Sequence, residues 1–352
     1  MKFGIRLRGV AAVAAVSLTL VATGCGGGGG GGGTEASPGA AGSEATENAN
    51  LAITFVPKNL GNPYFDTSDK GGEEAIKEFG GKYAEVGPAD ASPDAQVSYI
   101  NTLTQQQVGG IVISANDKKA IGDALNEARD AGIKVVTYDS DTAPEYRDLF
   151  INQATADGIA KVQIDMIADQ IGDSGEIAIL SASANATNQN AWIEMMKKEL
   201  AANHPNIKLV DVVYGNDKDQ ESFDKTAALL QSHPNLKGII APTTVGIAAA
   251  GRYLSTSKAK GKVALTGLGT PNQMREYVKD GTVKEFALWN PHDLGYLAAY
   301  ATKALITGEI KGKEGDKFKA GNLGEYTIGA DKTVVLGDPF KFNKDNIDQF
   351  KF

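Results

Sequence analysis

The sequence predicts an α/β protein of two similar lobes, each built on a doubly wound parallel sheet. From Leu51 onward, short apolar runs that fit buried strands alternate with segments of helical periodicity. The same order then repeats, and corresponding strands of the two halves are about 123 to 129 residues apart. The alternation indicates parallel sheets, and the repeat indicates two of them.

The first half contains a series of expected strands and helices. Its last helix is followed by Gly132, a typical stop signal. We expect strands over residues 53–56, 83–86, 110–114 and 135–138, and helices over residues 72–79, 95–107 and 120–131.

The second half repeats this order. Each of its first, third and fourth strands is followed by a polar or Gly-rich loop before the chain continues. We expect strands over residues 176–180, 209–214, 238–241 and 263–265, and helices over residues 192–202, 220–232 and 247–254.

The chain is expected to pass between the lobes more than once. Residues 151–153 and 288–291 fall where such crossings would lie, and a helix over residues 293–306 would return to the first lobe. Several crossings make a hinge that a ligand in the cleft can close. We therefore assign residues 51–150 and 291–322 to an N-terminal lobe, and residues 151–290 and 323–352 to a C-terminal lobe.

The amino-terminal residues have the pattern of a targeting segment. A basic start precedes an apolar run, residues 10–21, that is too short for a comfortable membrane span. The run ends in Ala22-Thr23-Gly24-Cys25, which resembles a bacterial lipoprotein signal, although a larger aliphatic residue is commoner than Ala22. The alternative is an ordinary secretory signal with an incidental cysteine. We expect a signal peptide over residues 1–24, lipidation of Cys25 and a Gly-rich tether over residues 25–50.

The composition argues against a nucleic-acid partner, a metal site and a disulfide within the chain. The net charge is −8, and no Lys/Arg run is dense enough for a phosphate-binding stripe, so nucleic acid is not an expected partner. Three histidines and one cysteine leave little material for a metal site, and a single cysteine cannot form a disulfide within the chain. We expect no metal and no cofactor.

The candidate site residues follow the expected strands or lie at the expected hinge. Strand ends of a parallel α/β sheet are where such folds bind small ligands. Amides, a lysine and carboxylates there can bond to hydroxyl groups, while aromatic faces pack on the C–H surface of a sugar. The set comprises Lys58, Asn59, Asn62, Tyr64, Phe65, Asp139, Asp141, Asn185, Asn188, Gln189, Thr243, Thr244, Trp289, Asn290 and Asp293.

Several of these residues have a structural alternative. Lys58 could be a solvated lysine in an ordinary loop, and Asn185 a turn residue. Asp139 could be a helix or turn cap, a role that suits Asp141 better because its loop continues into Thr142-Ala143-Pro144. Trp289 could belong to the core.

The sequence contains no recognisable catalytic constellation. There is no nucleophile elbow, no HExxH helix and no phosphate-cradling GxxxxGK[ST] loop. An exported sugar-acting enzyme would need two carboxylates flanking a sugar bond, and Asp139 with Asp141 or Asp293 is the only candidate pair. A transcriptional regulator would need a helix-turn-helix module where the signal and tether stand. We expect no enzyme activity.

From Leu51 to Phe352 the chain resembles the periplasmic sugar-binding proteins of ABC importers, of the ribose and galactose type. It is most similar to the rhamnose-binding and autoinducer-2-binding branch. The resemblance rests on several ordered motifs: VPKNLGNPYF, VVTYDSDT, FINQAT, TNQNAW, APTTVG, GLGTPNQMREYVKDGTVKEFALWN and FNKDNIDQF. It implies the type I periplasmic-binding-protein fold.

The resemblance also implies a ligand set. Autoinducer-2 receptors hold their ligand with residues that match Lys58, Asp139, Gln189 and Pro242, and with two positions at which this chain differs. Asn188 stands in place of a carboxylate, and Thr244 adds bulk and a hydroxyl group. The segments WNPHDLGYLA and PTTVGIAAA resemble the rhamnose-binding branch. Together with the two differences, they favour L-rhamnose or a similar deoxyhexose as the ligand, with autoinducer-2 as the alternative. Ribose and galactose receptors usually carry an aspartate where this chain has Leu268.

The function implied is that of a substrate-binding lipoprotein of an ABC importer. It would capture a small sugar by hinge closure and deliver it to membrane permease subunits, while a separate subunit uses ATP. We expect a monomer outside the cytoplasm, anchored to the membrane through Cys25, and periplasmic in a double-membraned cell.

Overall fold

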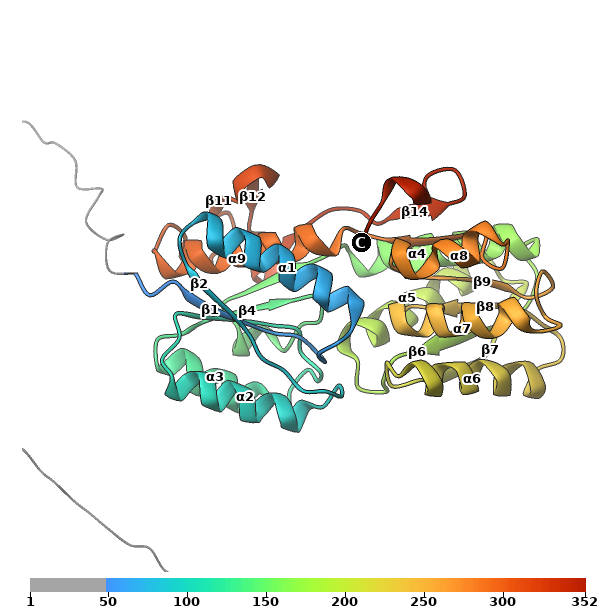
Figure 1. The fold of residues 1–352 in the computed structure, drawn as a ribbon, viewed down its shortest axis with the longest axis horizontal. Coiled ribbons are helices and arrows are strands. Elements are labelled where there is room, and N and C mark those ends of the chain that lie inside the picture. The colour runs from blue at the N-terminus through green and yellow to red at the C-terminus, as the bar shows by residue number, and fades with distance from the viewer. Residues whose placement is uncertain (1–48) are drawn as a thin grey trace, which may run out of the picture. The chain divides into compact units, whose positions relative to one another are not determined.

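The computed structural model describes residues 49–352. The expected signal peptide, the lipidated Cys25 and nearly all of the tether lie outside the described residues. Within residues 49–352, no helix combines the length and the apolar character needed to cross a membrane. The described chain forms two α/β lobes with parallel sheets, as the sequence predicts (Figure 1).

The first lobe is built on a six-stranded parallel sheet in the order β13-β5-β4-β3-β1-β2. All four strands expected in the first half are confirmed to within one residue at each end. The strands are β1 (Ala52–Val56), β2 (Lys82–Glu85), β3 (Gly110–Ile113), β4 (Lys134–Tyr138), β5 (Leu149–Asn152) and β13 (Thr333–Val335).

Helices cover both faces of this sheet. Helices α1 (Pro63–Glu78) and α9 (Pro291–Ile306) lie on one face, and α2 (Pro93–Gln105) and α3 (Gly122–Asp130) on the other (Figure 1). Ile53 and Phe55 of β1 are buried on the α1 side, and Val56 joins a separate buried cluster with α2 and α3. The apolar run of β1 is therefore buried on both faces, as parallel sheets require.

The second lobe has a four-stranded parallel sheet in the order β7-β6-β8-β9. A parallel bridge between Leu268 and Ala287 continues it toward the antiparallel pair β10 and β14. The strands are β6 (Gly175–Ser181), β7 (Ile207–Tyr214), β8 (Leu236–Ala241), β9 (Ala264–Gly267), β10 (Glu285–Leu288) and β14 (Phe340–Asn343). The helices are α4 (Ala156–Ile171), α5 (Thr187–Asn203), α6 (Asp219–Ser232), α7 (Thr244–Thr256) and α8 (Pro271–Lys279).

Within residues 49–352 the chain passes between the lobes at three places, and the last differs from the prediction. The first two follow β5 and β10, where the sequence placed them. The tail assignment of residues 323–352 to the second lobe is wrong in part, because β13 pairs in parallel with β5 of the first sheet. A hairpin of β11 (Lys317–Lys319) and β12 (Glu325–Thr327) precedes β13, and the chain crosses only before β14. The other lobe boundaries remain our assignment.

Several helices begin earlier than their periodicity predicts, and this moves site residues from loops into first helical turns. Helix α1 begins at Pro63 rather than residue 72. The Asn62 side chain accepts a hydrogen bond from the Tyr64 backbone N–H at 3.1 Å, and Pro63 occupies the first helical position. Helices α4 and α8 were not predicted.

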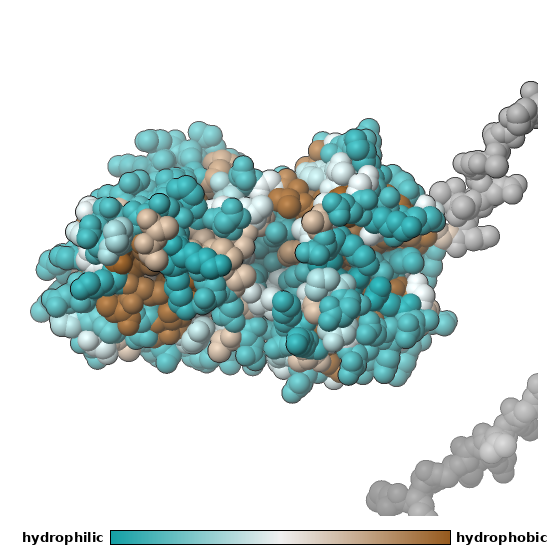
Figure 2. Space-filling model, turned by 180° about the vertical axis from the view of Figure 1, so that it is seen from behind, coloured by the Kyte–Doolittle hydropathy of each residue, from teal (hydrophilic) through white to brown (hydrophobic). Residues whose placement is uncertain are grey.

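Helices α1 and α9 pack with their backbones in close approach. A Cβ atom on Gly295 would lie 1.7 Å from the carbonyl oxygen of Ser68, and one on Gly71 would lie 2.0 Å from that of His292. The glycines therefore set the distance between the two helices. The face of the molecule shown in Figure 2 is largely hydrophilic, with apolar residues gathered in a few patches.

We predict that Gly295→Ala destabilises the protein by about 3 kcal/mol, because the methyl group forces the two helices apart. Thermal or urea unfolding measures this. Gly337→Ala is the matched control, since no atom lies within 4 Å of a Cβ there. Equal stabilities of the two variants would contradict the packing account.

Candidate functional site

A cavity with an empty volume of about 370 Å³ lies between the lobes. Both lobes and the second crossing line it. The lining residues are Lys58, Asn62, Tyr64, Phe65, Asp139, Asn188, Gln189, Trp192, Asp217, Pro242, Thr243, Thr244, Leu268, Leu288 and Trp289.

Lys58 and Asp139 form the charged part of the first-lobe wall. They follow β1 and β4, and each is no more than 5% exposed. The Lys58 Nζ lies 3.7 Å from Asp139 Oδ2, which also accepts a hydrogen bond from Ser114 Oγ at 2.8 Å. Asn116 Nδ2 donates to the Lys58 carbonyl at 2.9 Å and fixes the loop. The alternative of a solvated Lys58 is therefore wrong.

The backbone at Asp139 is strained. Its φ is +60°, a left-handed value that non-glycine residues seldom adopt, and the Ser140 N–H donates to the Tyr138 carbonyl at 2.6 Å across it. Such strain persists only where surrounding contacts hold it, and it gathers at ligand sites. The turn points the Asp139 carboxylate at the cavity instead of letting it cap a helix.

Asn188 and Gln189 lie in the first turn of α5, across the cavity. Lys58 Nζ donates to Asn188 Oδ1 at 2.9 Å, and Asn188 Nδ2 donates to Asp139 Oδ2 at 3.3 Å. The lobes are thus joined directly through these three side chains. Gln189 is held within its own lobe, because its Oε1 accepts from Ser181 Oγ and from the Ala182 N–H at 2.6 and 2.7 Å.

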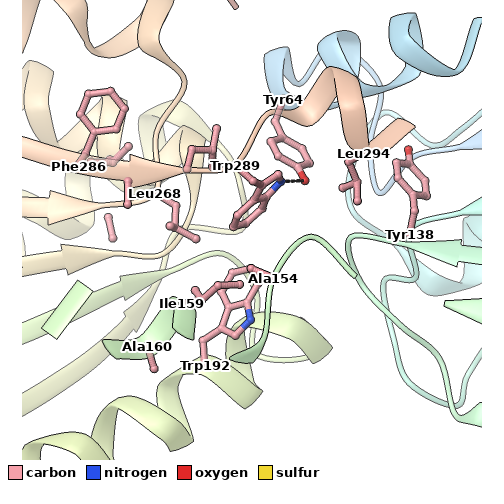
Figure 3. Close-up of a cluster of buried hydrophobic side chains, with 14 of the residues drawn as sticks. Tyr64, Tyr138, Ala154, Ile159, Ala160, Trp192, Leu268, Phe286, Trp289 and Leu294 are labelled. Carbon is pink, nitrogen blue, oxygen red and sulfur yellow. Dashed lines mark hydrogen bonds between the residues drawn. The ribbon is translucent and has the colours of Figure 1, made fainter. Parts of the chain in front are cut away.

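Aromatic side chains form the remaining wall. Tyr64 comes from α1, Trp192 from α5 and Trp289 from the crossing, and the Trp289 indole donates to the Tyr64 hydroxyl at 2.9 Å (Figure 3). The two indole rings pack edge to face with centroids 6.1 Å apart. Burial, and then the charge of Asp139, raise the pKa of Tyr64 well above its usual value. Tyr64 therefore stays protonated and can donate its own O–H.

Some of the predicted residues do not line the cavity. Asp141 instead forms a two-point ion pair with Arg147, with N–O distances of 2.6 and 2.8 Å, so its role is structural. Asn290 caps α9 by accepting from the His292 N–H. The cavity wall also lacks Asn59, Asp293 and Asn185. Neither Asp141 nor Asp293 therefore faces Asp139 across the cavity as a second carboxylate.

The sequence analysis did not propose some of the residues that line the cavity. Asp217 follows β7, and the general expectation of polar groups after parallel strands would have found it. Trp192 and Leu288 were missed because both match an ordinary core position in a helix or a strand. Asn62 and Thr243 belong to the candidate set and do line the cavity, whereas Leu268 was noted only as the position at which ribose and galactose receptors carry an aspartate.

One cluster outside the cavity has the residue types of a metal site. Asp165, Glu199 and His204 each offer a ligand atom, and these atoms lie within 4.8 Å of one another. The Lys161 ammonium lies 2.8 Å from Asp165 and 3.9 Å from Glu199. The lysine supplies the balancing charge, so the cluster is explained as a surface ion-pair network.

A family model described as a periplasmic binding protein domain matches residues 53–310, which is more than half of the chain. The chain belongs to this family. The resemblance drawn from the sequence motifs is confirmed, and the chain is a binding protein and not an enzyme.

Solved structures of periplasmic binding proteins are similar to this one. A sugar ABC transporter protein from Actinomyces odontolyticus is 56% identical, with a TM-score of 0.70 and coverage of 86% of this chain and 99% of that chain. A solute binding protein from Clostridium phytofermentas with bound L-rhamnose is 40% identical, with a TM-score of 0.83 and coverage of 86% and 98%. LsrB from Clostridium saccharobutylicum in complex with AI-2 is 27% identical, with a TM-score of 0.80 and coverage of 85% and 99%.

A buried carboxyl group holds the side chain of Tyr138, the residue that directly precedes the strained turn at Asp139. Asp69 of α1 is 1% exposed, and its Oδ1 accepts from Tyr138 Oη at 2.7 Å and from Ser68 Oγ at 2.9 Å. Its Oδ2 has no hydrogen-bond partner among the described residues. Burial first, and then the nearby Glu85, raise the pKa of Asp69 well above its usual value.

This predicts a pH-dependent effect of Asp69→Asn. Because the folded state raises the pKa, the stability associated with Asp69 is fully present below its unfolded pKa, about 3.9, and is lost as pH rises through the folded pKa. Asn keeps the acceptor for Tyr138 but cannot ionise. We expect the melting temperature of the variant, relative to the native chain, to rise from about pH 4 upward and to level off once the buried carboxyl group has ionised.

The control is Asp130→Asn on the exposed end of α3. A difference between Asp69→Asn and the native chain that does not change with pH would contradict the buried-acid account.

Proposed function

We propose that this periplasmic binding protein captures a small uncharged sugar between its lobes and delivers it to the permease of an ABC importer. The observation that carries the proposal is the cavity itself. Directional polar groups from both lobes and a wall of aromatic rings line one cavity. This combination suits a molecule with hydroxyl groups on its edge and C–H groups on its faces.

L-rhamnose is the ligand we favour. The similar protein of Clostridium phytofermentas has this sugar bound, and its identity of 40% is high enough to make the likeness informative. The cavity has apolar side chains, Leu268 and Leu288, beside the two indole rings. An apolar wall suits the methyl group of a 6-deoxyhexose better than the hydroxymethyl group of galactose.

The alternative ligand is autoinducer-2. Lys58, Asp139, Gln189 and Pro242, the positions shared with its receptors, all border the cavity, and LsrB of Clostridium saccharobutylicum is structurally similar. Asn188 and Thr244 are the positions that differ. Asn188 lacks the negative charge of a carboxylate, and its amide bonds instead to Lys58 and Asp139.

Capture would work by hinge closure. Lys58 and Asp139 belong to one lobe and Asn188 to the other, so a ligand that contacts all three holds the lobes together. Three chain crossings restrict the motion to opening and closing of the cleft. The closed form would then be presented to the permease subunits, and a separate subunit would supply ATP hydrolysis. The binding protein would act as a monomer.

The amino-terminal pattern completes the proposal. A lipid on Cys25 would anchor the chain outside the cytoplasm, in the periplasm of a double-membraned cell, and the Gly-rich tether would let the lobes reach the permease.

We predict that Lys58→Met and Asp139→Ala each weaken L-rhamnose binding about 10- to 100-fold or more, because each removes a charge-assisted hydrogen bond and leaves its partner unpaired. Titration calorimetry of the purified chain measures the loss. Lys77→Met on the exposed surface of α1 is the control. Both tryptophans of the chain border the cavity, so tryptophan fluorescence gives a second readout.

Native binding of autoinducer-2 with no response to L-rhamnose would support the alternative ligand. If neither ligand nor ribose binds, the proposed ligand class is wrong.

We also predict that Cys25→Ser moves the protein from the membrane fraction to the soluble extracytoplasmic fraction, because serine cannot carry the thioether-linked lipid. Fractionation and labelling with radioactive palmitate measure this. Unchanged membrane association without label in the native chain would contradict the anchor.

A further inference from the structure

A second carboxylate, Asp217, borders the same cavity as Asp139 but belongs to the opposite lobe. It lies in the loop between β7 and α6. Asn216 and Asp217 both have left-handed backbones, with φ values of +54° and +50°. This backbone conformation, uncommon for non-glycine residues, places the Asp217 carboxylate at the cavity wall.

The two oxygens of Asp217 have different surroundings. Oδ1 accepts a hydrogen bond from Thr243 Oγ1, and the same hydroxyl accepts from the Gly246 N–H at 3.3 Å as the cap of α7. No described residue donates to Oδ2. Asp217 keeps part of its surface accessible because it borders the cavity. One carboxylate oxygen is thus fixed by the protein, and the other is available to a ligand.

Among the described residues, the charged side chains that line the cavity are one cation, Lys58, and two carboxylates, Asp139 and Asp217. Two carboxylates face one ammonium group. The ammonium is already engaged by Asn188 Oδ1 and by Asp139 Oδ2. Burial raises the pKa of Asp217, while the hydrogen bond from Thr243 and then the charge of Lys58 oppose this rise. The cavity therefore offers hydrogen-bond acceptors in excess and no free cation for an anionic ligand.

We propose that Asp217 is the second-lobe acceptor for a ligand hydroxyl group and that it makes the cavity selective for uncharged polyhydroxylated ligands over sugar acids. This inference rests on the proposed sugar-binding function. A hydroxyl on one side of the ligand donates to Asp139 of the first lobe, and a hydroxyl on the other side donates to Asp217. Both bonds form together only when the lobes are closed, so Asp217 couples recognition to closure.

A purely structural role for Asp217 has a different signature. If its only task were to hold Thr243, then Asn would perform it, because the amide oxygen can accept the same hydrogen bond. In the cavity, however, Asn presents N–H donors in place of the free carboxylate oxygen and removes one negative charge. The substitution Asp217→Asn thus separates the two roles.

The experiment is titration calorimetry of the purified chain with matched sugars. L-rhamnose, D-ribose and D-galactose are the neutral probes, and L-mannuronate, which has a carboxylate where L-rhamnose has a methyl group, is the acidic probe. Asp217→Asn is compared with Asp224→Asn, an exposed acid on α6 that removes the same charge away from the cavity. Melting temperatures confirm that both variants fold.

We expect Asp217→Asn to weaken binding of the neutral ligand about 10- to 100-fold, and Asp224→Asn to leave it unchanged. The preference for the neutral sugar over the acid should shrink as well, because the repelling charge is gone.

Neutral binding that survives Asp217→Asn unchanged would overturn this inference and leave the sugar-binding function intact. Tight native binding of L-mannuronate would also overturn it. If the native chain binds none of the sugars, the proposed function fails and the inference fails with it.

Discussion

The contact among Lys58, Asp139 and Asn188 is the interaction on which the arrangement of the lobes depends. The two charged side chains are each only 6% exposed, and desolvation makes such charges costly unless they are paired and hydrogen-bonded. Ser114 and Asn188 supply the missing bonds from two different lobes. The first lobe thus leaves its own buried charges incompletely satisfied, and the second lobe or a ligand completes them.

The fold brings polar groups to this contact through the same strand–loop–helix arrangement in both lobes. Parallel strands end at the cavity, and helices α1, α5 and α7 begin there, so that side chains in their first turns face the same space. The N-terminal caps of α1 and α7, Asn62 and Thr243, themselves border the cavity. The same residues therefore end the loops, start the helices and line the site.

The sequence predicted the alternation, the repeat, the main strands and most of the cavity wall, because these follow from short-range periodicity and from the rule that ligands bind at strand ends. It could not predict the role of β13, since a three-residue strand has no periodic signal and its pairing with β5 depends on a distant crossing. Trp192 was predicted only as the first residue of a helix, because a cavity wall and a core position have the same apolar pattern. Asn290 was read as ligand-binding although its side chain caps α9.

The most direct test of the account is a crystal structure of the chain grown with L-rhamnose. We expect one sugar between the lobes, with hydroxyl groups within hydrogen-bond distance of Asp139 from the first lobe and of a polar side chain from the second, and with a ring face against Trp192 or Trp289. A sugar bound to one lobe alone, or outside the cavity, would contradict capture by closure.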